Sequence, residues 1–297
     1  MQFRTSPSLW SLYPKVIVAR KPALLRDGAT VPRIAAELSP VRIDAAHLRA
    51  YRECCGIAPE RFLPLAYPHV LASGLHLAVL SHAAFPVKLL GLVHVRNRIR
   101  QYRALNADES GVLQVVIEGH EDTARGQEFS LRSQWQTAAG ELVWEEECVF
   151  LARRKRAAPA AARDGDGDGD GDAAAADTSR PGGMRATSFR APAGLGRSYG
   201  VLSGDLNPIH LSDLSARLFG FKAAIAHGMW SMARCAADLD PGLLQSACEL
   251  NVSFKLPVFL PAWLLLEQWL SGGGSDFCLR DNQGQKPHLT GSLRLMQ

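Results

Sequence analysis

An acidic and a basic side chain stand five residues apart in the segment Ser203-Gly-Asp-Leu-Asn-Pro-Ile-His210. Asp205 and His210 can take and return protons near neutral pH, which is the chemistry needed to add or remove water. Five residues along a continuous helix would point the two side chains to different faces, so the chain must leave helical geometry between them. Gly204 and Pro208 allow that departure. We therefore expect the carboxylate to fold back towards the imidazole, so that the pair holds one water molecule.

The same segment predicts a short helix that begins beside this pair. Asn207 followed by Pro208 is typical of an N-cap and a first helical position, and the helix is expected over residues 208–218. His210 then lies in the first turn, where the helix dipole disfavours an imidazolium and keeps the ring able to accept a proton. Each residue alone has a common structural explanation, as a turn former or a solvated side chain, but the complete string is far more specific.

A second element begins at Ala226-His227-Gly228-Met229 and continues as an almost wholly apolar helix. The first N–H groups of a helix have no partner within it, and Gly228 lets a ligand approach the backbone closely. Such an N–H can stabilise negative charge on a carbonyl oxygen, typically by about 3 kcal/mol. The alternative is that Gly228 only permits tight packing, and His227 is expected to be structural.

Composition limits the classes of function. The formal net charge of +4 is small for 297 residues and indicates no nucleic-acid partner. Without a signal peptide or a run of about 18 apolar residues, we expect a cytoplasmic protein without a membrane span. The six cysteines, at positions 54, 55, 148, 235, 248 and 278, show neither a zinc pattern nor a disulfide framework, so reduced thiols are expected.

Residues 153–185 differ sharply from the rest of the chain. They are rich in Ala, Pro and Gly and alternate Asp with Gly from Asp164 to Asp172. Such a segment has little to bury, and its like charges repel, so it is predicted to be a disordered linker. The repeat lacks the closing Glu and the ligand spacing of a calcium loop. The linker separates two halves, residues 1–152 and residues 186–297.

The two halves share one order of predicted elements. Each opens with a strand-like stretch that reaches a tyrosine, has a glycine five residues later, continues into an apolar helix and ends in several strands. The helices are predicted over 68–82 and 228–239. The strands after them are predicted over 91–99, 112–117, 128–135 and 142–151 in the first half, and over 250–254, 263–270, 277–280 and 288–295 in the second. This order predicts an α+β fold in which an antiparallel sheet wraps around a central helix, present in two copies.

The duplication is unequal. Aligning Tyr51 with Tyr199 and the following glycines places Ile57 opposite Asp205 and Phe62 opposite His210. The first half therefore has neither the acid nor the imidazole at those positions. We interpret it as a degenerate structural half and the second as the catalytic half.

The string Ser-Gly-Asp-x-Asn-Pro-x-His, with the later Ala-His-Gly-Met, resembles the signature of the MaoC-like hydratases, also called the (R)-specific enoyl-CoA hydratase family. Residues 186–297 carry the resemblance, including Asn251-Val-Ser-Phe-Lys-Leu-Pro-Val258. The resemblance implies a double hotdog fold, a catalytic Asp205 and His210, and a Gly228 N–H that binds the thioester oxygen. The residues predicted to line the substrate site beside them are Ser203, Asn207, His227 and Met229.

The resemblance also implies the reaction, which is hydration of a trans-2-enoyl thioester to an (R)-3-hydroxyacyl thioester, or its reverse. The substrate would be carried on coenzyme A or on an acyl carrier protein, and no metal or other cofactor is expected. A hotdog thioesterase and a non-catalytic acyl-binding protein are the alternatives. The double copy already mimics the family's usual dimer, so both a monomer and a homodimer of the whole chain stay open.

Phosphate-binding cations are expected for such a carrier. His94, Arg96, Arg98 and Arg100 alternate along one predicted strand and should share one face, with Val93, Val95 and Ile99 towards the core. A solvated sheet face is the preferred explanation of this stripe, and phosphate binding is the alternative.

Overall fold

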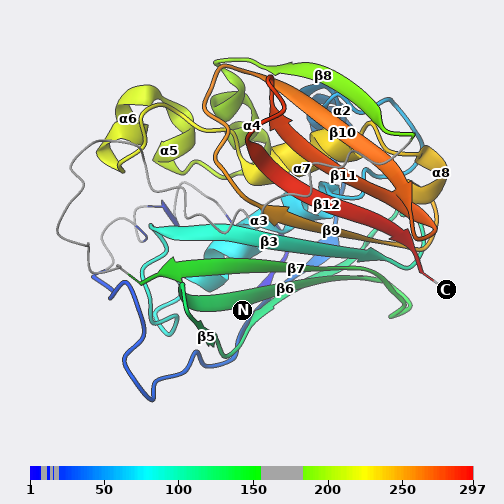
Figure 1. The fold of residues 1–297 in the computed structure, drawn as a ribbon. Coiled ribbons are helices and arrows are strands. Elements are labelled where there is room, and N and C mark those ends of the chain that lie inside the picture. Colours follow the sequence, from blue (N-terminus) through cyan, green and yellow to red (C-terminus); the bar gives the residue numbers. More distant parts are fainter. Residues whose placement is uncertain (8–11, 14–15, 17–19, 155–182, 297) are drawn as a thin grey trace, which may run out of the picture.

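The computed structural model describes residues 1–7, 12–13, 16, 20–154 and 183–296 (Figure 1). Most of the predicted linker, residues 155–182, therefore lies outside the described residues. Every strand among these residues belongs to one sheet, whose order is β1-β2-β4-β6-β7-β3-β9-β12-β11-β10-β8, with β5 paired to β6. The strands are β1 (Gln2–Phe3), β2 (Ile34–Val41), β3 (Leu92–Gln101), β4 (Gly111–Ile117), β5 (Glu121–Thr123), β6 (Gly126–Thr137), β7 (Leu142–Arg153), β8 (Arg185–Ala191), β9 (Cys248–Phe254), β10 (Ala262–Ser271), β11 (Gly274–Asp281) and β12 (Pro287–Leu295).

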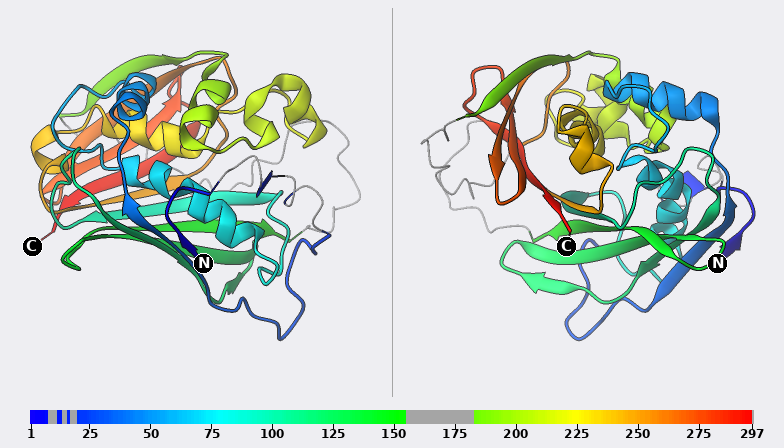
Figure 2. Two further views of the ribbon diagram at one scale, coloured as in Figure 1. Left: turned by 180° about the vertical axis from the view of Figure 1, so that it is seen from behind. Right: turned by 90° about the vertical axis from the view of Figure 1, so that its right-hand side faces the viewer.

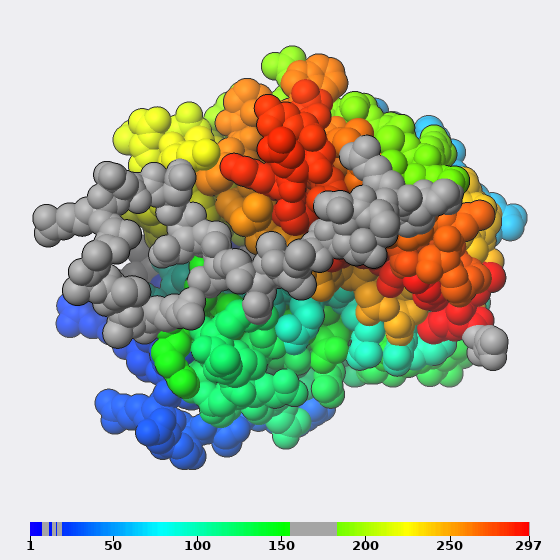
Figure 3. Space-filling model, viewed as in Figure 1, coloured from blue at the N-terminus to red at the C-terminus, as the bar shows by residue number. Residues whose placement is uncertain are grey.

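The sheet joins the two halves of the chain at the pairing of β3 with β9. These strands run antiparallel, from Arg96 opposite Ser253 to Gln101 opposite Cys248. All strands up to β7 lie on one side of this seam, and β8 to β12 lie on the other. In Figure 3 the cyan and green atoms of the first half meet the orange and red atoms of the second half on this outer face. The predicted duplication is thus a continuous sheet with one copy in each half.

The helices lie against the other face of the sheet (Figure 2). They are α2 (Ala45–Cys55), α3 (Tyr67–Ser81), α4 (Leu195–Ser203), α5 (Pro208–Leu211), α6 (Asp213–Leu218), α7 (Gly228–Ala236) and α8 (Pro241–Leu244). The two central helices, α3 and α7, are buried on nearly every side, as their almost continuous apolar sequences predict. Among the described residues, no helix is long and apolar enough to cross a membrane.

The prediction of a strand reaching each tyrosine is wrong in both halves. The strands end earlier, at Val41 and Ala191, and helices α2 and α4 carry Tyr51 and Tyr199. Helix α2 begins at that point because the Asp44 side chain accepts hydrogen bonds from the N–H groups of the first turn. In the first half this local cap therefore ends the strand before Tyr51.

The proposed alignment of the halves agrees with the backbone. Gly56 ends α2 and Gly204 ends α4, both in the left-handed conformation, with φ of 66° and 75°. The rings of Tyr51 and Tyr199 lie with their centroids 6.3 Å apart. The indole N–H of Trp230 donates to the Cys54 carbonyl, which joins α7 of one half to α2 of the other. The two halves therefore share one core.

In the first half, the loop that follows Gly56 is held in place by a buried side-chain cation, the guanidinium of Arg52. Arg52 is 6% exposed, and its guanidinium donates to the carbonyl oxygens of Ala58, Glu60 and Phe62. This loop occupies the sequence position of the Asp205 segment in the second half. The first half thus uses an arginine to order the backbone where the second half places an acid and an imidazole.

Replacing Arg52 with Met should destabilise the protein, because three carbonyl groups lose a charged donor. We expect a loss of about 3 kcal/mol in the free energy of unfolding. Urea unfolding of the variant measures it, with Arg49→Met as the control, since Arg49 is exposed on the same helix. Equal stability of the two variants would contradict this account of the loop.

Candidate active site

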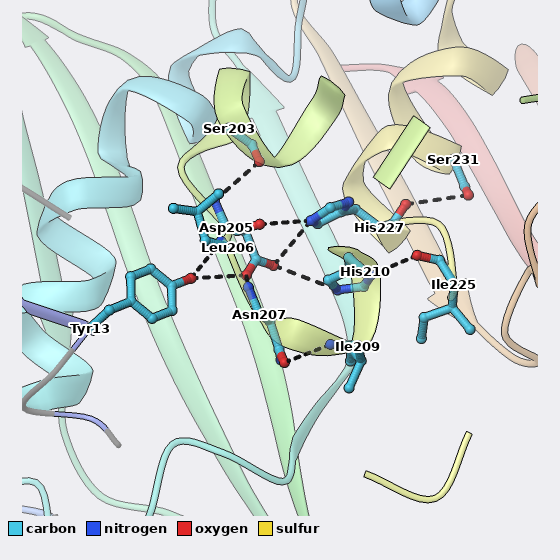
Figure 4. A network of polar contacts seen from close by, with 10 residues as sticks. All are labelled: Tyr13, Ser203, Asp205, Leu206, Asn207, Ile209, His210, Ile225, His227 and Ser231. Carbon is cyan, nitrogen blue, oxygen red and sulfur yellow. Dashed lines mark hydrogen bonds and ion pairs between the residues drawn. The ribbon is translucent and has the colours of Figure 1, made fainter. Parts of the chain in front are cut away.

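The Asp205 segment is a turn held by its own side chains. The Ser203 hydroxyl accepts from the Asp205 N–H at 3.3 Å, and the Asp205 carboxylate accepts from the Asn207 N–H at 3.1 Å. Asn207 caps α5 by accepting from the Ile209 N–H at 3.4 Å, with Pro208 at the start of the helix, as the sequence predicts. The turn brings the carboxylate back over the imidazole of His210 (Figure 4).

The single helix predicted over 208–218 is wrong, because two short helices replace it. Ser212 has an extended backbone between α5 and α6, with φ −160° and ψ 160°. Its hydroxyl accepts from the Ser215 N–H at 3.1 Å, which caps α6 and stops the first helix after one turn.

A backbone carbonyl decides which ring nitrogen of His210 is basic. His210 Nδ1 lies 2.8 Å from the Ile225 carbonyl oxygen, which can only accept, so Nδ1 carries the proton. Nε2 of the neutral ring is then unprotonated, and it lies 3.8 Å from the Asp205 Oδ2 atom. Ile225 is held in place in turn, because its N–H donates to the Ile209 carbonyl. The arrangement presents a free imidazole lone pair beside a carboxylate.

His227 completes the cluster in the opposite tautomer. Its Nε2 donates to the Asp205 backbone carbonyl at 2.9 Å and lies 3.8 Å from Asp205 Oδ2. The His227 ring stacks on the His210 ring, with centroids 3.7 Å apart and planes inclined by 24°. His227 thereby holds the Asp205 backbone next to both rings.

The protonation of the cluster follows from its burial. Burial lowers the pKa of His210, against the opposing attraction of Asp205 and the Ile225 carbonyl. For His227, burial and the adjacent His210 lower the pKa to about 3. Burial opposes the ionisation of Asp205, but the two histidines, the Asn207 N–H and the Tyr13 hydroxyl outweigh it, so its pKa is lowered. Burial therefore favours the neutral form of the His210 ring, the state that the sequence predicts.

Tyr13 reaches the same carboxylate from the far end of the chain. Its hydroxyl lies 3.3 Å from Asp205 Oδ1 and accepts from the Leu206 N–H at 2.6 Å. Burial and the charge of Asp205 both raise the pKa of Tyr13, so the phenol stays protonated and donates to the carboxylate. Sequence reasoning missed this residue, because a single tyrosine 192 positions before Asp205 carries no local signal.

Helix α4 approaches the site through two glycines. A Cβ at Gly196 would lie 1.8 Å from the His210 carbonyl oxygen, and one at Gly200 would lie 3.0 Å from the Asp205 carbonyl oxygen. Side chains at these positions would push the Asp205 segment away from α4. The four-residue spacing of the two glycines on one helix face was a sequence signal for this close approach.

The central helix α7 begins next to the cluster. His227 is its N-cap, and no side chain caps the helix, because the His227 ring bonds the Asp205 carbonyl instead. A Cβ at Gly228 would lie 3.0 Å from the Phe254 ring. Tight packing against Phe254 therefore explains the glycine, and so does access of a ligand to the backbone. Met229 is buried in the core. The substrate contacts expected from Ser203, Asn207, His227 and Met229 stay predictions.

The predicted cationic stripe on β3 is divided between two faces. A bulge between His94 and Arg96 interrupts the pairing with β7. Val95 packs in a small apolar cluster separate from the main core. The His94 ring stacks on the Phe150 ring, with centroids 4.8 Å apart, so His94 does not share the surroundings of the arginines. The prediction that Val93 and Val95 face the main core is also wrong.

The three arginines of the stripe pair with carboxylates. The pairs are Arg96 with Glu128, Arg98 with Glu147, and Arg100 with Glu145 and Glu249. This pairing agrees with a solvated, ion-paired sheet face. Two hollows lie on that face, and neither is lined by Asp205 or the histidines beside it.

Known proteins resemble this chain in sequence and in fold. The family model described as "MaoC like domain" matches residues 195–290, which include Asp205, His210 and His227 but not Tyr13. The 3-hydroxyacyl-thioester dehydratase X of Mycobacterium tuberculosis is 28% identical over 264 residues, covering 89% of this chain and 90% of that protein. The crystal structure of that protein, HtdX, superimposes with a TM-score of 0.73 at 27% identity, over 89% of this chain and all of the other.

Two more distant structures show the same fold. A MaoC-like dehydratase from Phytophthora capsici has a TM-score of 0.67 at 17% identity, over 90% of this chain and 96% of its own. A Mycobacterium tuberculosis protein described as having a double hotdog fold has a TM-score of 0.52 at 13% identity, over 91% of this chain and 96% of its own. The fold is therefore a double hotdog, and residues 195–290 in its second half match the MaoC-like domain model.

The depressed pKa of His227 makes stability depend on pH. An unfolded histidine takes up a proton below about pH 6.5, whereas the folded ring does so only near pH 3, so its contribution is complete above pH 6.5 and is lost as the pH falls towards 3. Between pH 7 and pH 5 this ring should account for about 2 kcal/mol of lost unfolding free energy. Urea unfolding at both values should show a smaller loss in His227→Asn than in the wild type. Equal losses would show that the folded ring titrates normally.

Proposed function

We propose that the protein is an acyl-thioester hydratase, or dehydratase in the reverse direction. The observation that carries the proposal is the Asp205 carboxylate 3.8 Å from the unprotonated Nε2 of His210, at the start of an apolar central helix. An ionised acid beside a neutral imidazole is the proton-transfer equipment that hydration of a conjugated double bond needs. The dehydratase name of the Mycobacterium tuberculosis relative supports the same reaction class.

The thioester would lie with its carbonyl oxygen at the start of α7. The N–H of Gly228 has no acceptor within the helix, and no side chain caps this end. A hydrogen bond from this N–H would withdraw electrons from the conjugated double bond and make the β-carbon electrophilic. The same bond would stabilise the oxygen as negative charge gathers there during the reaction.

In the hydration direction, Asp205 and His210 would hold the attacking water between them. The water oxygen forms a bond to the β-carbon, while His210 Nε2 takes one of its protons, because Nδ1 already carries its own. The electron pair of the double bond moves to the α-carbon, which then takes a proton from the Asp205–His210 pair. One water is added in total, and no redox change takes place. Elimination follows the same path in reverse.

The finer details rest on the resemblance of the motif. They are a trans-2-enoyl substrate, an (R)-3-hydroxyacyl product, and coenzyme A or an acyl carrier protein as carrier. No step in this scheme uses a metal or another cofactor.

Two other functions would give different outcomes with the same substrate, crotonyl-CoA. A thioesterase would release a free thiol from crotonyl-CoA, and an acyl-binding protein would change nothing. Loss of the enoyl absorbance without free thiol is the outcome expected for hydration. Chiral analysis of the product then tests the (R) configuration.

Asp205→Asn and His210→Ala should each reduce kcat on crotonyl-CoA by about a thousandfold, because each removes one partner of the proton transfer. Absorbance assays measure the rates, and circular dichroism checks that both variants stay folded. A folded variant with a rate near that of the wild type would refute the proposed roles.

Tyr13→Phe should lower kcat by about tenfold and shift the acidic limb of the pH–rate profile to higher pH. The hydroxyl donates to Asp205, so its loss destabilises the carboxylate anion and raises the pKa of that group. The KM should change little if Tyr13 only positions Asp205. An unchanged acidic limb would show that Tyr13 does not act through the carboxylate.

A further inference from the structure

The side chain of His94 leaves the cationic stripe and turns to the inner face of the sheet. It lies near the start of β3, which runs beside β9 at the seam between the halves (Figure 1). The bulge between His94 and Arg96 puts two successive side chains on the outer face, where Val95 joins the small apolar cluster and Arg96 pairs with Glu128. A bulge re-aims the side chain next to it, and such bulges are common beside active sites. His94 therefore faces the helices.

The His94 ring lies close to the start of α7. Its centroid is 4.8 Å from that of Phe150 and 4.9 Å from that of Phe254, the last residue of β9. The Phe254 ring in turn packs against Gly228, where a Cβ would lie 3.0 Å from it. The charge of Asp205 also acts on the pKa of His94, in the direction that raises it. One phenyl ring thus separates His94 from the N–H that is proposed to bind the thioester oxygen.

The Nε2 atom of His94 is buried and has no hydrogen-bond partner among the described residues. Buried polar atoms are rarely left unpaired, so this nitrogen is available to a group from outside the chain. Burial lowers the pKa of His94 to about 4, so the ring is neutral near pH 7. His94, Phe150 and Phe254 are each partly exposed, so the helices do not cover this stretch of the sheet completely. An uncharged hydrogen-bonding group fits this position.

The acyl end of the substrate is the part that can reach this buried atom, because the bulky carrier stays outside. The first half is polar near His94: His69 lies 2.9 Å from Glu146, and both act electrostatically on His94. A site for a hydrocarbon tail would have an apolar lining instead. The Glu146 carboxylate, already paired with His69, also disfavours a second anion. A neutral polar group on the acyl chain meets both conditions.

We propose that His94 Nε2 forms a hydrogen bond with a hydroxyl group on the acyl chain, so that the protein prefers hydroxylated enoyl thioesters. A hydroxyl can donate or accept, so it pairs with Nε2 in either tautomer of the ring. A chain without the hydroxyl would leave Nε2 unpaired, and sites of this kind discriminate strongly against such analogues. His94 is then a specificity-determining residue in the half that lacks the Asp205–His210 pair, an assignment that rests on the proposed function.

Enoyl-CoA substrates with and without a terminal hydroxyl test this role. A series of trans-2-enoyl-CoA chains of increasing length places the hydroxyl at different distances from the double bond. At the matching length, kcat/KM of the wild type should be at least about tenfold higher for the hydroxylated chain, as one hydrogen bond allows. His94→Phe should lose this preference, and His94→Gln, whose amide can pair with the hydroxyl, should keep part of it. The ratio is taken within each protein, so a general loss of activity or stability cancels.

His120→Phe is the matched control and should keep the wild-type preference. His120 also lies against a phenylalanine ring, that of Phe129, and has a buried ring nitrogen without a partner in the part of the chain that the structure describes, but its ion pair is with Asp122. No preference in the wild type, or one that persists in His94→Phe, would overturn the role of His94. Crotonyl-CoA carries no hydroxyl, so its turnover without any preference among the longer chains refutes this role alone. No turnover of any chain refutes the hydratase as well.

Binding provides a readout that does not depend on turnover. Saturated acyl-CoA molecules of the same lengths, with and without the terminal hydroxyl, cannot be hydrated, and calorimetry measures their Kd. At the matching length the hydroxylated chain should bind the wild type about tenfold more tightly than the plain chain. The two chains should bind His94→Phe with similar Kd values. Equal affinities in the wild type at every length would contradict the hydrogen bond to Nε2.

Discussion

The site depends on the hydrogen bond between His210 Nδ1 and the carbonyl oxygen of Ile225. A carbonyl can only accept, so this contact places the proton on Nδ1 and leaves Nε2 as the base facing Asp205. The contact depends in turn on the short connection before α7, because the Ala226 N–H bonds the Val258 carbonyl and holds that connection against the chain that follows β9. The central helix and the His210 imidazole are thus positioned by the same few residues.

The second constraint is the balance of charges over the stacked histidines. Two imidazolium rings 3.7 Å apart would repel strongly, and burial disfavours both charges. The cluster therefore holds one negative charge on Asp205 above two neutral rings. Donors from Asn207 and Tyr13 stabilise that charge. A neutral base next to an ionised acid is the state that general base catalysis at neutral pH requires.

The two halves show how one fold supports different uses. Both end a helix with a left-handed glycine and both pack a tyrosine at their shared core. In the first half the buried Arg52 orders the loop after Gly56. Buried polar side chains of that half also lie on α3 and β7, where His69 contacts Glu146. The half without the Asp205–His210 motif therefore has a carboxylate–imidazole contact of its own, between Glu146 and His69, which do not align with that motif.

The sequence by itself determined the duplication, the two central helices, the N-cap at Asn207 and the pairing of Asp205 with His210, because these depend on local caps, turns and hydrophobic periodicity. It did not determine the helices that carry Tyr51 and Tyr199; in the first of them the Asp44 N-cap overrode a strand-like pattern. Only the tertiary structure decided the tautomers of His210 and His227, the approach of Tyr13, the bulge that separates His94 from the arginines and the cluster around Glu146. Each of these rests on contacts between segments that are distant in sequence, or on burial, and neither leaves a trace in local residue order.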